Sequence, residues 1–243
     1  MLIASRFCGP PASANGGYCA GLLASALEGS VEVTLRSPPP LERQLELRRE
    51  PARVELKDGE QLVAEARCAP LDLRVPPAPS FERAVELSRH YCGHRRHHFP
   101  GCFVCGPARA AGDGLRIFPG GERGHELVAA PFRPDASLRG ERAVLGREFV
   151  WAALDCVGYF GSALPDYPVA LLGRMTAEVL APIALEEPCV VIGWSLGREG
   201  RKLEAGTAIF GADGKLRGRA RQTWLLRSKS FAPPASPASQ QPG

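Results

Sequence analysis

The sequence predicts an α+β fold in which an antiparallel sheet wraps around a central helix, and it predicts this unit twice. The segment 149–164 is apolar on all sides except for a single aspartate, which is typical of a buried helix. Four long segments near 170–180, 188–198, 201–210 and 215–227 follow it and are expected to be strands. A helix, a strand with prolines and an Asp-Gly hairpin also occur in the same order in both halves of the chain.

The N-terminal half begins with one helix and continues as strands. The segment ANGGYCAGLLASAL (14–27) opens on two glycines and then becomes apolar, which predicts a helix whose start is approached closely by another group. VEVTLRS (31–37) and LELRRE (45–50) alternate apolar and polar residues, as half-buried strands do. RVELKDGEQLVAEAR (53–67) is expected to form two strands around an Asp-Gly turn.

The middle of the chain separates the two units. Ser80 is suited to cap a short helix at 81–90, whose apolar residues have helical spacing. The basic, turn-rich segment GHRRHHFPG (93–101) follows as a linker. Strands are then expected at GLRIF (114–118) and HELVAAPF (125–132).

These patterns divide the chain into four parts. Residues 1–79 are the first unit, 80–101 a helical and basic linker, and 102–228 the second unit. The tail 229–243 is rich in Pro, Ala, Ser and Gln and is expected to be disordered.

The two units align as an internal repeat. NGGYCAGLLA (15–24) corresponds to GREFVWAALD (146–155), and the hairpins DGEQLVAEARC and DGKLRGRARQ correspond further along. The matched pairs are Pro38 with Pro182, Arg67 with Arg221, and Cys68 with Gln222.

Composition excludes several classes of protein. The chain has 243 residues, is 44% hydrophobic and 23% charged, and carries a net charge of +4, with no concentrated basic region that would indicate a nucleic-acid partner. No apolar run reaches the length that a membrane span needs, and the N-terminus lacks the pattern of a signal peptide. We therefore expect a cytoplasmic protein without a membrane partner, whose eight cysteines are mostly free thiols.

Three motifs in order resemble those of a known family. CFVCGPARAAGDGLRIF (102–118) is similar to the entry segment of many hotdog-fold thioesterases, NGGYCAGLLA (15–24) to their His-Gly-Gly helix start, and WAALD (151–155) to the stretch that carries the helix acid. The chain thus resembles the hotdog fold of acyl-CoA thioesterases and dehydratases, as two fused hotdog units that cover all but the linker and tail. The resemblance implies a site between two hotdogs, to which one unit supplies glycine backbone and the other a carboxylate.

The departures from the family pattern are complementary between the two copies. In the first copy Asn15 stands for the histidine, Gly16 and Gly17 remain, and Ala24 stands where the acid belongs. The second copy lacks the glycines but has Asp155. Each copy has therefore kept one half of a site, which predicts one composite site per chain and an inactive reciprocal site.

The expected chemistry is hydrolysis of an acyl-CoA-like thioester to a carboxylate and a thiol, without a cofactor. A Gly16 or Gly17 N–H at a helix N-terminus would polarise the thioester carbonyl and hold the oxyanion. Asp155 would act as general base or as nucleophile. A non-catalytic protein that binds acyl ligands is the alternative, and a homo-oligomer of double-hotdog units is expected for either.

Further site residues follow from the resemblance. In double-hotdog acyl-CoA thioesterases of the type II class a glutamine near Gln222 helps the acid to position water, but their Thr or Ser has only a poor match, Thr176. Asn15 and Tyr18 are expected to contact substrate, with Asn15 also capping its helix.

A second motif competes with this interpretation. Cys102 and Cys105 form a CxxCG half-site, and His98, with Cys92 or His94, has the residue type and spacing to complete a structural zinc site. Similar segments serve as packing elements in hotdog proteins, and a zinc-stapled interaction module is a third functional hypothesis.

Overall fold

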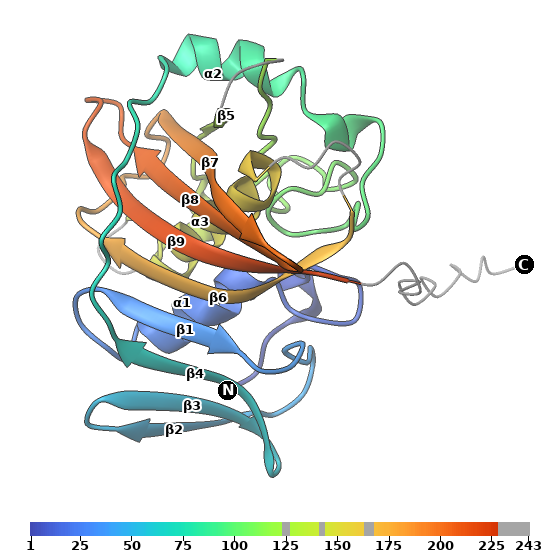
Figure 1. Cartoon of the computed structure of the whole chain (residues 1–243), viewed down its shortest axis with the longest axis vertical. Coiled ribbons are helices and arrows are strands. Elements are labelled where there is room, and N and C mark those ends of the chain that lie inside the picture. The colour runs from blue at the N-terminus through green and yellow to red at the C-terminus, as the bar shows by residue number, and fades with distance from the viewer. Residues whose placement is uncertain (123–126, 141–143, 163–167, 228–243) are drawn as a thin grey trace, which may run out of the picture.

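The computed structural model describes residues 1–122, 127–140, 144–162 and 168–227, and these build one nine-stranded antiparallel sheet (Figure 1). The strand order is β2-β3-β4-β1-β6-β9-β8-β7-β5. The strands are β1 (Val31–Leu35), β2 (Glu46–Glu50), β3 (Arg53–Asp58), β4 (Gln61–Cys68), β5 (Leu127–Phe132), β6 (Ala170–Val179), β7 (Cys189–Glu199), β8 (Lys202–Phe210) and β9 (Leu216–Leu226). The α-helices are α1 (Gly16–Ala24), α2 (Phe81–Ser88) and α3 (Arg147–Gly161).

Most of the predicted elements are confirmed, but the strand expected at 114–118 is wrong. Gly114 and Arg116 have positive φ angles (121° and 52°), which interrupt a strand, and the segment pairs with the CxxCG turn instead of the sheet. The Leu115 amide donates to Phe103 O (2.8 Å) and the Ile117 amide to Val104 O (2.9 Å). The predicted tail, with the ends of two predicted elements at 125–126 and 163–164, lies outside the described residues.

The sheet is pseudo-symmetric about its centre. β1 and β6 are equivalent strands of the two copies and pair with each other, and each is followed outward by its own hairpin strands. In β1–β4 the register places Glu32 opposite Arg67, and in β6–β9 it places Thr176 opposite Arg221. The two arginines aligned in the sequence therefore occupy the same place in their units, as the proposed internal repeat requires.

α1 and α3 lie on one face of the sheet and pack against each other closely. A Cβ at Gly17 would lie 2.5 Å from Asp155 Cβ, and one at Gly21 would lie 2.6 Å from Glu148 Cα. Glycines one helical turn apart thus allow α3 to approach the backbone of α1. This contact explains why a buried helix begins with residues that weaken helices.

The opposite face of the C-terminal half of the sheet is covered by α2 and the segment that leads to it, which crosses in front of the strands in Figure 1. Leu73 and Leu87 pack with Ile192 in an apolar layer there, and the Arg219 guanidinium donates to Leu73 O (2.7 Å). Part of the predicted linker 80–101 is therefore packed against the sheet.

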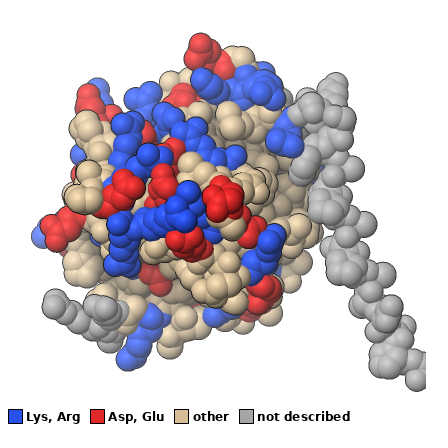
Figure 2. Space-filling view, turned by 90° about the horizontal axis from the view of Figure 1, so that it is seen from below, with Lys and Arg blue, Asp and Glu red and all other residues tan. Residues whose placement is uncertain are grey.

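The surface mixes both signs of charge. In the view of Figure 2, Lys and Arg side chains are interspersed with Asp and Glu. On β1–β4 the pairs are explicit, since Arg67 contacts Glu32 (2.8 Å) and Arg53 contacts Glu65 (2.5 Å). Among the described residues, no helix combines the length and apolar character needed to cross a membrane.

Candidate active site

A pocket of about 210 Å³ opens where the N-terminus of α1, the C-terminal part of α3 and strand β6 meet. Both halves of the chain contribute to it. Its apolar wall includes Leu35, Tyr159, Phe160, Leu172 and Trp224. Its polar residues include Asn15, Asp155 and several basic side chains. The structure thus brings together, in one pocket, residues that lie 140 positions apart in the sequence.

Asn15 is the N-cap of α1 and is almost fully buried. Its Oδ1 accepts a hydrogen bond from the Tyr18 amide (2.9 Å), as an N-cap side chain does. Its Nδ2 donates to Asp155 Oδ2 (2.7 Å). Both ends of the amide are engaged within the protein, so Asn15 orients the carboxylate, although it also lines the pocket.

Asp155 is the buried acid of α3, with 1% of its surface exposed. Its Oδ2 accepts hydrogen bonds from Asn15 Nδ2 and from the Gly17 amide (3.0 Å). Its Oδ1 has no hydrogen-bond partner within the part of the chain that is described. Burial raises the pKa of Asp155 to about 7, and the two hydrogen bonds on Oδ2 oppose this rise. One carboxylate oxygen is therefore held in place by two hydrogen bonds, and the other is buried without a hydrogen bond from the described residues.

Gly16 and Gly17 have different roles. The Gly17 amide is used by Asp155, so it is not available to a ligand. Gly16 is half-buried, lines the pocket and begins the helix, and across the described residues its amide makes no hydrogen bond. The Gly16 N–H, at the positive end of α1, is the donor that can meet a carbonyl oxygen.

Gln222 lies behind α3 and is not among the residues that line the pocket. Its Nε2 donates to Leu154 O (2.6 Å) and Asp155 O (3.1 Å), and its Oε1 accepts from Trp224 Nε1 (2.8 Å). The β6 residue beside it is Met175, which carries no hydroxyl. These contacts position the helix turn that carries Asp155, and they leave the Gln222 amide no contact with the pocket.

Tyr18 and Thr176 also lie away from the pocket. Tyr18 is buried in an aromatic cluster, stacked on Phe7 with ring centroids 4.1 Å apart, where burial raises its pKa to about 12. The Thr176 hydroxyl donates to Glu32 (3.5 Å), its neighbour across β1 and β6. The substrate contact expected of Tyr18 finds no support in this geometry, because its ring packs in the core.

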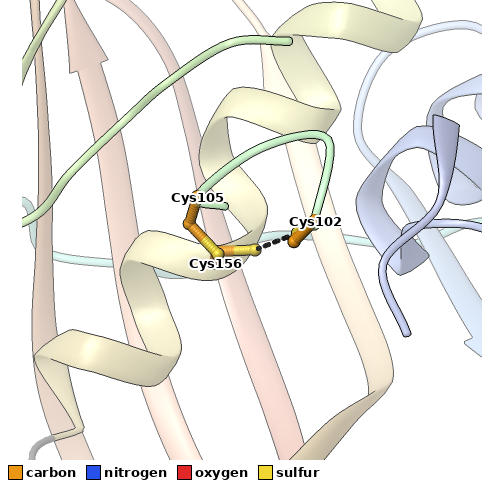
Figure 3. A group of neighbouring side chains, drawn as sticks. All are labelled: Cys102, Cys105 and Cys156. Carbon is orange, nitrogen blue, oxygen red and sulfur yellow. Dashed lines mark hydrogen bonds between the residues drawn. The ribbon is translucent and has the colours of Figure 1, made fainter. Parts of the chain in front are cut away.

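Three buried thiols gather at the pocket: Cys102, Cys105 and Cys156, whose sulfur atoms all lie within 4.8 Å of one another (Figure 3). His97 Nε2 lies 3.3 Å from Cys105 Sγ. Sequence reasoning missed Cys156 and His97. The only signal for Cys156 was its place directly after the helix acid.

The reciprocal end of the helix pair is organised differently. Gly146 is the N-cap of α3 there, and Ala24 stands where an acid would be. The Arg147 guanidinium donates to Leu27 O (3.0 Å) and thus satisfies a carbonyl beyond the C-terminus of α1. A cation and an alanine replace the acid and glycines of the first end.

Comparison with known proteins identifies the fold. No protein-family model and no curated protein sequence matches the chain. Solved structures do: a candidate thioesterase from Novosphingobium aromaticivorans (TM-score 0.61, 13% identity, 94% of each chain covered) and a TesB protein from Mycobacterium avium subspecies paratuberculosis (0.58, 14%, 90% of each). A third is the acyl-CoA thioesterase II TesB2 from Mycobacterium marinum (0.56, 13%, 94% of this chain and 92% of that one). The predicted fold of two fused hotdog units, and the predicted resemblance to thioesterases of that fold, are confirmed.

Proposed function

We propose that the chain hydrolyses acyl thioesters in the pocket between its two hotdog units. The observation that carries this proposal is the pairing of a buried carboxylate, whose Oδ1 has no hydrogen-bond partner in the described segments, with the N-terminus of a helix from the other unit. The thioesterases among the solved structures of this fold support it.

The proposed reaction uses two groups, the Asp155 carboxylate and the backbone N–H of Gly16. The thioester carbonyl accepts a hydrogen bond from Gly16 N–H, and a water bound at Asp155 Oδ1 attacks the carbonyl carbon while the carboxylate takes its proton. The tetrahedral oxyanion is stabilised by the Gly16 amide and the helix dipole, a donor worth about 3–4 kcal/mol in comparable sites. The C–S bond then breaks, and protonated Asp155 returns the proton to the leaving thiolate.

The pocket lining favours an anionic thiol carrier such as coenzyme A. Arg36, Arg96 and Arg227 contribute to the pocket, and guanidinium groups are the preferred partners of phosphates. The apolar wall then receives the acyl chain. All eight cysteines, each in a described segment, are free thiols, which fits a reducing compartment such as the cytoplasm.

The test is thiol release from a panel of short, long and aromatic acyl-CoAs, with wild type compared with Asp155→Asn. The amide keeps the volume and can still accept the two hydrogen bonds, but it cannot take a proton. Turnover should fall by about 100-fold, as for loss of a general base. Glu148→Gln, the same change on the same helix at the reciprocal end, should retain activity. Equal rates for Asp155→Asn and wild type would refute the role of the acid.

A second function is favoured by three features of the site. The Gly17 amide is already used, Gln222 faces away from the pocket, and Met175 replaces a hydroxyl. These features suit a protein that binds acyl ligands without hydrolysing them. Wild-type protein that binds acyl-CoA in calorimetry yet releases no thiol from any member of the panel would establish this alternative.

A further inference from the structure

The thiol cluster lies in the same pocket as Asp155 but has no role in the proposed hydrolysis. Cys102 and Cys105 come from the loop at the start of the second unit, and Cys156 comes from α3, so two distant segments contribute to it (Figure 3). Each residue is at most 7% exposed. Free thiols are weakly polar and are often buried singly, but three sulfur atoms gathered within 4.8 Å of one another form a ligand set.

The spacing of the sulfur atoms fits a tetrahedral metal. Thiolates bound at 2.3 Å to zinc stand about 3.8 Å apart along a tetrahedral edge. Cys102 Sγ and Cys156 Sγ are 3.8 Å apart. The CxxCG turn itself is tight, because a Cβ at Gly106 would lie 2.4 Å from Pro100 O. A glycine after the second cysteine is therefore required by the loop that presents both sulfurs.

Polar N–H groups point at the sulfur atoms. Asn15 Nδ2 donates a hydrogen bond to Cys156 Sγ (3.8 Å). Neutral thiols are weak acceptors, whereas metal-bound thiolates commonly receive such bonds from their surroundings.

His97 supplies one more donor. The Phe99 amide donates to His97 Nδ1 (2.9 Å), so the neutral ring carries its proton on Nε2 and directs it at Cys105 Sγ, 3.3 Å away. With Nε2 protonated, His97 supports the thiolate of Cys105 and is not itself a ligand.

We propose that Cys102, Cys105 and Cys156 bind one Zn²⁺ ion as three thiolates, with His97 and Asn15 as hydrogen-bond donors to the sulfur atoms. Binding releases the three thiol protons to solvent, and the remaining charge of −1 is balanced in part by these N–H groups. The fourth coordination position faces the pocket, which all three cysteines line, and is filled by water or a ligand atom. The ion joins the CxxCG loop to α3 directly beside Asp155.

The experiment measures metal in protein purified without chelators, and then the spectrum of metal-free protein titrated with Co²⁺. We expect about one zinc per chain, and thiolate charge-transfer bands with tetrahedral d–d bands in the cobalt form. Cys156→Ala should reduce bound zinc to below about a tenth, and Cys102→Ser should do the same if the first variant folds poorly. Cys189→Ala removes an equally buried thiol from β7 and should keep the metal.

The variant His97→Ala separates ligand from donor. If His97 acts only as a hydrogen-bond donor to Cys105 Sγ, its removal should weaken zinc affinity by about 10–100-fold. The cobalt spectrum should remain that of a tetrahedral site with three thiolates. Complete loss of metal in His97→Ala would overturn the three-thiolate assignment. Protein with no bound metal and no cobalt bands, or a disulfide between Cys102 and Cys156 in freshly purified protein, would overturn the site. All of these readouts are independent of whether the chain hydrolyses thioesters.

Discussion

Replacing Gly17 by alanine tests how far the site depends on the contact between the two helices. The added methyl would lie 2.5 Å from Asp155 Cβ and 2.7 Å from Trp151 O, so α1 and α3 must move apart. Overpacking of this kind costs about 1–3 kcal/mol. Alanine recovers about 0.5–1 kcal/mol of this through its better helix propensity. We expect a net loss of about 1–2 kcal/mol, which lowers Tm by about 2–8 °C in a chain of this size.

The same movement should impair the proposed chemistry. It lengthens the hydrogen bond from the Gly17 amide to Asp155 and shifts the Gly16 amide that begins the helix. A misplacement of about 1 Å can cost up to 100-fold in rate, so we expect kcat for acyl-CoA to fall by about 10–100-fold.

Thermal melts followed by circular dichroism and thiol release measure the two effects. Gly21→Ala is the matched control, because its methyl would lie 2.6 Å from Glu148 Cα and forces the same helices apart one turn further along. It should lower Tm at least as much as Gly17→Ala but reduce kcat less. A Gly17→Ala protein with wild-type Tm and wild-type kcat would refute the reasoning. Equal losses of kcat in both variants would show that the rate depends on helix packing in general and not on Gly17 in particular.

Three further outcomes are expected. Gln222→Leu removes the hydrogen bonds to the backbone of α3 and should lower the free energy of unfolding by about 1–3 kcal/mol. Its loss of kcat should be smaller than that of Asp155→Asn, and an equal loss would indicate a catalytic role for Gln222. Thr207→Val replaces a fully buried hydroxyl without a partner in the described residues and should raise that free energy by about 1 kcal/mol in denaturant titrations; a destabilised variant would contradict this. Arg96→Ala should raise KM several-fold, about the effect of one exposed charge contact, for an acyl-CoA but not for the acyl-pantetheine that lacks the phosphates; equal changes for both substrates would exclude a phosphate contact.

The fold could be predicted where the pattern is local or repeated. The strands β3 and β4 followed from alternation around an Asp-Gly turn, and Gly59 indeed has a positive φ of 59°. The equivalent positions of Arg67 and Arg221 in the two units followed from comparing the two copies. The segment 114–118 has the alternation of a strand, but its partner is a turn that no local pattern reveals. Alternation indicates burial of one face and does not identify the neighbouring segment.

The same distinction applies to the site. The proximity of Asp155 to the glycines could be inferred, because each copy lacks what the other has. Gln222 was assigned by resemblance, but the orientation of its amide depends on three partners in space. Cys156 was missed because a CxxC motif specifies only its own two ligands. A further proposed ligand lies wherever the chain folds back to the motif, and Cys156 lies on a helix that begins some 40 residues later.

The asymmetry of the duplicated fold has a physical reason. A buried carboxylate is costly unless hydrogen bonds and a helix N-terminus compensate it, and at Asp155 both are present. At the other end the helix start is Gly146, and Arg147 is bound to the carbonyl of Leu27. An acid at position 24 would meet no glycine pair and no cap like Asn15. The two helix ends are therefore stabilised by different groups, and the proposed site needs residues from both units.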